Sequence, residues 1–159
     1  MSTASTLVIK VPQGQGCIQN FTLEPSLPDG DVAGEWKFSQ IDENGNCQDA
    51  DDFSVVFDKN SSWLQKQSEL CVLVVTMNKP GWRFAMEGTK SCKNEENTAD
   101  VLHDVRTEIG GNGKVLKAYI QSLGNLDETV GFSFVAAHVS ENGTTTIYQS
   151  PDPKGNIQR

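Results

Sequence analysis

The residues Val130–Pro151, with the sequence VGFSFVAAHVSENGTTTIYQSP, decide the expected fold. Two β-rich runs, Val130–Val139 and Thr144–Gln149, flank the dipeptide Asn142-Gly143. Asn-Gly between two such runs is the strongest short-range signal for a β-hairpin, because a type I′ turn needs positive φ at both central residues. The segment therefore predicts two antiparallel strands joined by a tight turn.

The position of this turn predicts the register of the hairpin. A two-residue turn at Asn142-Gly143 places Val139 opposite Thr146 and Ala137 opposite Tyr148. Each face of the hairpin is then mostly apolar, which indicates a strand pair inside a sheet that is covered on both sides. One face is expected to carry Phe132, Phe134, Ala136, His138 and Ile147, and the other Val135, Ala137, Val139, Thr146 and Tyr148.

A second hairpin is predicted upstream, where apolar and polar residues alternate over Asp100–Ile109. Gly110-Gly111-Asn112-Gly113 follows and has the composition of a hairpin loop. With the turn centred there, Leu116, Ala118 and Ile120 lie on the same face as Val105. Turn chemistry and apolar pattern agree, which favours this pairing.

Most of the remaining chain consists of short β-rich runs separated by turn residues. Together with the two hairpins, these runs predict about nine strands for the whole chain. Parallel sheets usually need long helical crossovers, and the chain has no room for them. We therefore expect an all-β fold, an antiparallel β-sandwich that is immunoglobulin-like in the broad sense, with a closed β-barrel as second choice. The expected strands here are Thr6–Val11, Cys17–Leu23, Glu35–Ile41, Phe53–Phe57, Leu70–Met77 and Trp82–Glu87.

The only expected helical turn is Ser62–Glu69, and no linker divides the chain. The length of 159 residues suits one domain with a proper core. We predict a single domain over residues 1–159, in which Asp152–Arg159 forms a short flexible C-terminal tail.

Charge and composition exclude several classes of partner. The net charge is −8, and a surface of that sign repels phosphate backbones, so no nucleic acid partner is expected. No apolar run approaches the roughly 18 residues needed to span a bilayer, and the first residues lack the pattern of a secretion signal. We expect a cytoplasmic protein with no membrane partner.

The four cysteines, Cys17, Cys47, Cys71 and Cys92, include no C-x-x-C pair, so the spacing indicates neither a zinc ribbon nor a redox motif. In a cytoplasmic protein we expect four reduced thiols. Cys71 lies in an apolar run and is predicted to be buried.

Two dipeptides suggest a family. Glu24-Pro25, which ends the second expected strand, and Asp152-Pro153, which follows the last hairpin, resemble the paired landmarks of the bacterial DP-EP family. The resemblance implies a β-rich protein of this size. It implies no activity, cofactor or site.

The chain contains two histidines, His103 and His138, which are the candidates for metal binding or acid–base catalysis. Both share a strand face with apolar residues. One hypothesis makes them ligands of one metal or an acid–base pair, together with Asp104. Alternation along the strand, however, directs Asp104 away from His103. We therefore favour the other interpretation, in which both histidines are partly buried and bonded to nearby groups.

The acidic stretch Asp42–Asp52 has a partial calcium pattern, because oxygen ligands recur at alternate positions. An EF-hand loop would need glycine and glutamate where Cys47 and Phe53 stand, so that motif is excluded. A looser metal site remains a candidate beside the simpler interpretation of a solvated acidic loop. The candidate ligands are Asp42, Asn44, Asp49 and Asp51.

Tryptophan faces suit sugar binding, so the three tryptophans are candidates for a ligand platform. Trp36 and Trp82 each open an alternating strand and are predicted to lie in the core, whereas Trp63 is expected to be exposed. Trp63, Tyr148 and His138 are the candidate ligand-binding residues.

No nucleophile or phosphate-binding motif occurs in the chain, so no catalytic residue and no cofactor is predicted. We expect a non-catalytic binding or protein-interaction module and not an enzyme. Unblocked sheet edges invite partners, which favours a homo-oligomer or a protein partner. The alternatives are a small metal-dependent hydrolase that uses the two histidines, and a sugar- or calcium-binding β-sandwich module.

Overall fold

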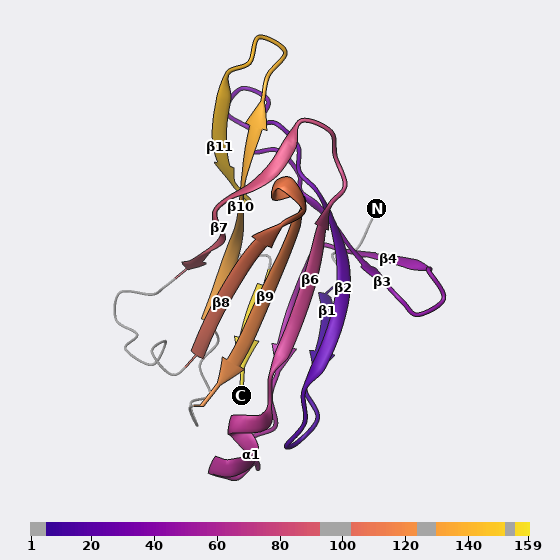
Figure 1. Ribbon diagram of the computed structural model, residues 1–159, viewed down its shortest axis with the longest axis vertical. Coiled ribbons are helices and arrows are strands. Elements are labelled where there is room, and N and C mark those ends of the chain that lie inside the picture. The colour runs from indigo at the N-terminus through magenta and orange to yellow at the C-terminus, as the bar shows by residue number, and fades with distance from the viewer. Residues whose placement is uncertain (1–5, 93–102, 124–129, 152–154) are drawn as a thin grey trace.

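A computed structural model of the chain describes residues 6–92, 103–123, 130–151 and 155–159. These residues form a mostly β protein with two six-stranded sheets and one short α-helix (Figure 1). No closed barrel forms among them. The elements are β1 (Thr6–Lys10), β2 (Cys17–Glu24), β3 (Lys37–Ile41), β4 (Cys47–Ala50), β5 (Asp52–Val56), α1 (Trp63–Ser68), β6 (Cys71–Met77), β7 (Trp82–Cys92), β8 (His103–Gly110), η2 (Gly111–Gly113), β9 (Val115–Ser122), β10 (Val130–Val139), β11 (Thr145–Gln149) and β12 (Gly155–Gln158).

The first sheet contains β1, β5, β12, β10 and β11 in that order, with β7 on the other side of β10. The second sheet has the order β4-β3-β2-β6-β9-β8. The prediction of an all-β architecture is thus confirmed at the level of two sheets. The expected count of about nine strands was too low, since the described residues alone form twelve.

The expectation of purely antiparallel sheets was wrong. The pairs β1–β5, β5–β12 and β2–β6 are parallel. Between β2 and β6, and between β1 and β5, the chain crosses into the opposite sheet and returns. A crossover made of strands in the second layer replaces the helix that a parallel pair usually needs. Both sheets are therefore mixed.

A stack of aromatic rings joins the two sheets. Phe38 on β3 lies 4.9 Å from Phe53 on β5 and 5.9 Å from Phe134 on β10, measured between ring centroids. All three side chains are fully buried, as is Phe21 on β2, which stacks on Phe38 at 4.5 Å. Alternation in each strand places one side chain in two between the sheets, and these rings fill that layer.

The β8–β9 hairpin forms, and its apolar residues share a face as predicted. Val105 lies opposite Ile120, and Ile109 lies opposite Leu116, so the apolar residues share one face. Gly111–Gly113 forms a single 3₁₀ turn in which Asn112 adopts a φ of 58°. Asparagine tolerates this left-handed conformation better than most residues, which explains its place in the turn.

The β10–β11 hairpin differs from the prediction by one residue. Val139 lies opposite Thr145 and Ala136 opposite Tyr148, because the loop is longer than two residues. The Gly143 N–H donates to the Ser140 carbonyl, and only Gly143 in this loop has positive φ. A type I turn followed by a left-handed glycine has taken the place of the type I′ turn. A shift of one residue exchanges the two faces of a strand, so Tyr148 points inward and Ile147 outward.

Two polar segments expected to be loop or tail are strands. Cys47–Ala50 forms β4 and pairs with β3, within the predicted acidic loop. Gly155–Gln158 forms β12, between β5 and β10, with Ile157 fully buried. The expected flexible tail is therefore an interior strand in this part of the chain. Its single apolar side chain gave no strand pattern to recognise.

The short helix α1 lies where it was predicted. Ser62 caps it by accepting from the Gln65 N–H, and the Gln65 side chain accepts from the Ser62 N–H. This reciprocal capping box defines the start of the helix. In Figure 1, α1 lies at one end of the molecule and the β10–β11 hairpin projects from the other.

Candidate functional site

Two of the three predicted ligand-binding residues meet at the hairpin end of the molecule. The ring of Trp82 lies 4.9 Å from His138 and 5.6 Å from Tyr148. Trp82 is 2 % exposed and packs edge-on against Trp36, which confirms that both tryptophans belong to the core. His138 and Tyr148 are half-buried, so they form the outer layer of an aromatic cluster.

An open hollow lies beside this cluster. The β6–β7 turn forms one wall of it, and the Lys79 ammonium in that turn donates to the Pro25 carbonyl at 2.7 Å. Asn78 donates to the Glu24 carboxylate at 3.0 Å. The Glu24-Pro25 dipeptide thereby anchors the turn against the end of β2. The hollow is lined by Leu27, Pro80, Gly81, His138, Val139, Ser140, Glu141 and Asn142.

The outer face of the first sheet carries a second hollow, which the sequence analysis missed. Between Phe134 and Ala136 the register of β10 with β7 shifts, and β7 bulges outward. Met86 and Glu87 have φ of 49° and 69°, followed by Gly88 at 78°. Left-handed conformations at two non-glycine residues are costly and persist only where surrounding packing imposes them. Apolar and polar residues alternate without interruption over Trp82–Glu87, so this pattern does not predict the bulge. Gly88 is the only residue here whose type indicates one.

The bulge places an apolar side chain over the outer face. Met86 is 70 % exposed and Ile147 on β11 is 49 % exposed. Between them lies Val135, which is nearly buried. They belong to a groove across β7, β10 and β11, which we call the outer groove, lined by Met86, Thr89, Lys90, Val135, Ile147, Tyr148 and Gln149.

Strand β11 forms an edge of the first sheet. Among the described residues it pairs only with β10. At its two ends, the Ser140 N–H donates to the Thr144 carbonyl, and the Ser150 N–H donates to the Phe134 carbonyl. Hydrogen-bonded positions alternate in an antiparallel pair, so the backbone groups of the odd-numbered residues between them point away from β10. These residues are Thr145, Ile147 and Gln149.

Trp63, the third predicted ligand-binding residue, does not join this cluster. It lies on α1, at the opposite end of the molecule (Figure 1). Its side chain is 60 % exposed, as predicted. It makes no ring contact with an aromatic side chain of the described residues, so the three candidates do not form one site.

The four candidate metal ligands lie along the β3–β4 hairpin and just beyond it. Asp42 sits in the turn, where its carboxylate accepts from the Asn44 and Asn46 N–H groups at 2.9 and 2.8 Å. Asp49 lies three ladder positions away, accepts from the Ser39 hydroxyl and pairs with Lys37 at 3.3 Å. Within the described part of the chain, no group of three His, Cys, Asp or Glu residues could hold a metal ion.

The pKa of Asp49 reflects these contacts. The Ser39 hydrogen bond lowers it most, and the Lys37 contact lowers it further. The carboxylate is thus held by neighbouring protein groups. The remaining candidate, Asp51, is exposed between β4 and β5.

The two histidines lie far apart. His138 contacts the ring of Trp82. The Trp82 carbonyl accepts a hydrogen bond from the ammonium of Lys114, which directly precedes β9, so His138 lies near the start of β9. His103 pairs with Ser122, at the other end of β9. The length of this strand puts their backbones about 20 Å apart. That distance does not favour a metal or an acid–base site shared by both.

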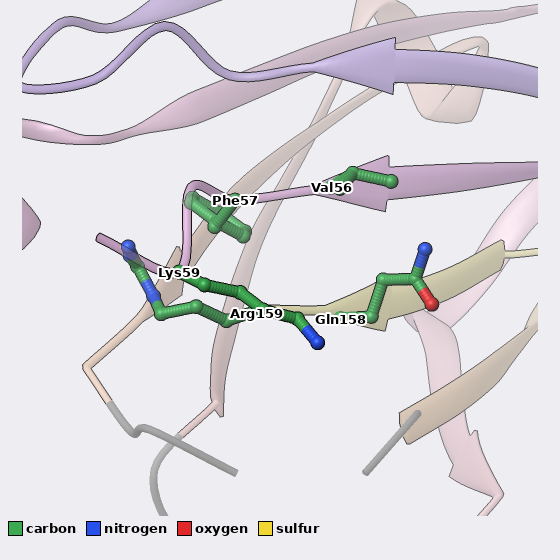
Figure 2. A pocket seen from close by; sticks show the side chains of 5 residues that line it. All are labelled: Val56, Phe57, Lys59, Gln158 and Arg159. Carbon is green, nitrogen blue, oxygen red and sulfur yellow. The ribbon is translucent and has the colours of Figure 1, made fainter. Parts of the chain in front are cut away.

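A buried ion pair closes the end of the molecule that carries α1. Arg159 Nη1 lies 2.6 Å from Glu69 Oε1, and both side chains are almost completely buried. Arg159 also donates to the Asp58 and Ser122 carbonyls at 2.8 and 2.5 Å. The Arg159 guanidinium lies 4.9 Å from the ring centre of Phe57. Figure 2 shows that the Arg159 side chain points away from the side-chain amide of the preceding Gln158.

Glu69 is fully satisfied in this cluster. One carboxylate oxygen accepts from the Gly14 N–H at 2.7 Å and from the Ser61 hydroxyl at 2.5 Å, while the other accepts from Arg159. Burial acts to raise the pKa of Glu69, but these hydrogen bonds and the Arg159 charge outweigh it, and the pKa is lowered. The ion pair therefore joins β12, α1 and the loop after β1. Sequence analysis missed it because Arg159 lay in the expected tail.

Comparison with known proteins identifies the family. A profile of the DP-EP family matches residues 5–159. The chain belongs to the DP-EP family. No curated protein and no solved structure matches it.

The match covers both landmark dipeptides of this DP-EP protein. Glu24-Pro25 lies beside the hairpin-end hollow, and Asp152-Pro153 lies outside the described residues. No helix in the described part of the chain has the length and apolar character needed to cross a membrane.

Proposed function

We propose that this DP-EP protein is a non-catalytic interaction module that binds a second copy of itself through the edge of β11. The observation that carries the proposal is the outer edge of β11, which pairs with no other strand of the described residues. Its sequence, Thr-Thr-Ile-Tyr-Gln, contains no charged residue and no proline. Natural sheet edges are usually blocked by such residues, because an open edge pairs with other strands. This one carries β-branched and aromatic residues that favour strand pairing.

The edge is complementary to itself. Ile147 is the middle residue of β11, and its N–H and carbonyl point outward together with those of Thr145 and Gln149. Two antiparallel copies related by a two-fold axis at Ile147 would place Ile147 opposite Ile147, and Thr145 opposite Gln149. Each outward group then meets a partner, and the first sheet continues across the dimer. Such isologous pairing is the commonest symmetry of homo-oligomers.

The outer groove supports the same interface. Ile147 is one of its lining residues, and Met86 stands on the opposite rim. Dimerisation through β11 would bring the two Ile147 side chains together and extend the apolar surface from one groove into the other. Burial of this surface would add to the hydrogen bonds of the new strand pair.

Light scattering at micromolar concentration tests the proposal. The wild-type protein should have twice the mass of one chain. Ile147→Pro should be monomeric, because proline removes an outward N–H that the monomer does not use. Ile147→Lys should also be monomeric, whereas Ile18→Lys, at an even more exposed isoleucine on β2, should remain dimeric. Circular dichroism should show that all three variants are folded.

Two results would refute the proposal. One is a wild-type protein that stays monomeric at high micromolar concentration. The other is a dimer unaffected by both Ile147 variants, which would place the interface elsewhere. A monomer that carries stoichiometric zinc, lost in His103→Ala, would instead support the hydrolase alternative.

A further inference from the structure

Cys17 and Cys71 occupy directly opposite positions on the parallel strands β2 and β6. The register is fixed beside them, where the Cys17 N–H donates to the Leu70 carbonyl at 2.9 Å. Neighbouring strands lie about 4.8 Å apart, which falls within the range of Cα separations that a disulfide bridges, about 4.4–6.8 Å. Opposite residues in a parallel ladder also direct their side chains to the same face. The two thiols are therefore placed to react with each other.

The two sulfurs differ in environment. Cys71 is completely buried, whereas Cys17 is half-buried. The Cys71 thiol donates a hydrogen bond that lowers the pKa of Cys17 to about 7, against the opposing effect of burial. The same hydrogen bond, burial and the charge of Cys17 raise the pKa of Cys71. Above its own pKa, Cys17 carries the thiolate, and Cys71 holds a proton beside it. Thiolate character and accessibility are the properties that select a cysteine for oxidation.

We propose that Cys17 and Cys71 form a peroxide-sensitive dithiol that closes to an intramolecular disulfide. The Cys17 thiolate attacks one oxygen of hydrogen peroxide, the O–O bond breaks, and the departing hydroxide takes a proton to become water. The Cys71 sulfur then attacks the Cys17 sulfenic acid. An S–S bond forms, the S–O bond breaks, and the hydroxyl leaves as water with the Cys71 proton. The two thiols supply the two electrons that reduce one peroxide to two waters.

The remaining cysteines provide an internal contrast. Cys47 is exposed on β4 and has no cysteine partner in the described part of the chain. Exposure alone would make it the first thiol to react. The proposal instead predicts that only Cys17 and Cys71 give an intramolecular disulfide. This reaction is independent of the interface proposed at β11.

The test uses the full-length Cys47→Ser/Cys92→Ser protein, in which only the proposed pair remains. After brief treatment with hydrogen peroxide, intact mass spectrometry should show the loss of two hydrogen atoms per chain. Peptide mapping without reductant should join the peptides that contain Cys17 and Cys71. Dithiothreitol should restore both thiols.

Two further variants in this background test the order of the steps. With Cys71→Ser, which keeps a hydrogen-bond donor beside Cys17, oxidation should stop at a Cys17 sulfenic acid that dimedone captures. With Cys17→Ser, Cys71 should remain a thiol after the same treatment, as shown by alkylation in denaturant. Dimedone capture on the parent protein, with Cys71 still alkylated after unfolding, would overturn the proposal. So would direct oxidation of Cys71 in the Cys17→Ser variant.

Discussion

Strands β11 and β12 both pair with the same side of β10, but within the described residues only β12 has a second neighbouring strand. It lies between β10 and β5, and its Ile157 is fully buried. Among the strands that the structure describes, the more apolar β11 pairs with β10 alone, and its Ile147 is 49 % exposed. Composition would assign the interior position to the wrong strand. A short strand is buried when a second strand pairs with its other edge, whatever its own composition.

The ends of the molecule show the same contrast. At the α1 end, Arg159 satisfies the Glu69 carboxylate and two backbone carbonyls, so the end of β12 is fastened from several sides. At the hairpin end, the outward backbone groups of β11 have no strand to bind within the described chain. The first arrangement stabilises the fold, and the second provides the backbone groups that the proposed dimer would use.

The largest effect is expected from removal of the charge that fastens β12. Arg159→Met leaves Glu69 buried without its cation, and breaking a buried pair in this way costs about 3–5 kcal/mol of unfolding free energy. Urea denaturation measures the loss. Lys37→Met, which breaks the exposed pair with Asp49, is the control and should leave the midpoint almost unchanged. Equal losses in the two variants would contradict the proposed role of the buried pair.

Truncation of the two isoleucines compares the strands directly. Ile157→Ala should lower the unfolding free energy by about 2–5 kcal/mol, because it leaves a cavity between the sheets. Ile147→Ala should change it by less than about 0.5 kcal/mol when the measurement is made on monomeric protein. A larger loss at Ile147 than at Ile157 would mean that the β10–β11 register is not the one described here.

Alanine substitutions at two glycines compare the destabilisation caused by a steric clash with that caused by a left-handed backbone conformation. A Cβ at Gly155 on β12 would come within 2.4 Å of the Phe132 ring, so Gly155→Ala should cost about 1–3 kcal/mol through overpacking. At Gly143, in the hairpin loop, a Cβ meets open space, but φ is +86°. Gly143→Ala should therefore cost only about 1 kcal/mol, from the left-handed backbone. Chemical denaturation of both variants would distinguish them, and Gly143→Asn should recover part of the loss.

The smallest effect concerns pH. The pKa of Glu69 is lowered in the folded protein from the ordinary value of 4.5 for a glutamate side chain. The stabilisation it provides is fully present above that value and is lost as pH falls through the lower, folded-state pKa. The difference in unfolding free energy between wild type and Glu69→Gln should thus be constant near neutral pH and shrink in acid. A difference that grows as pH falls would show that the pKa is raised instead.

The sequence alone predicted the features that depend on local chemistry. Alternating side chains predicted the strands and the core positions of Phe134, Trp36 and Trp82. The glycine-rich loop predicted the β8–β9 pairing, and Ser62 with Gln65 capped the expected helical turn. Each of these features is determined within a few residues, by the direction of a side chain or the φ that a turn requires.

Only the tertiary structure decided the features that depend on neighbours distant in sequence. Strand β12 has one buried apolar side chain and became an interior strand because β5 and β10 offered hydrogen bonds on both sides. The parallel pairs formed because the chain crosses between two layers, and the bulge at Met86 appears only in the register of β7 with β10. The single-residue shift of β11 was decided by the longer turn, and it turned Tyr148 toward Trp82 and Ile147 toward solvent. Long-range pairing and packing supply energies that local propensity does not contain, and they fixed the candidate interface, the Arg159–Glu69 pair and the Cys17–Cys71 pair.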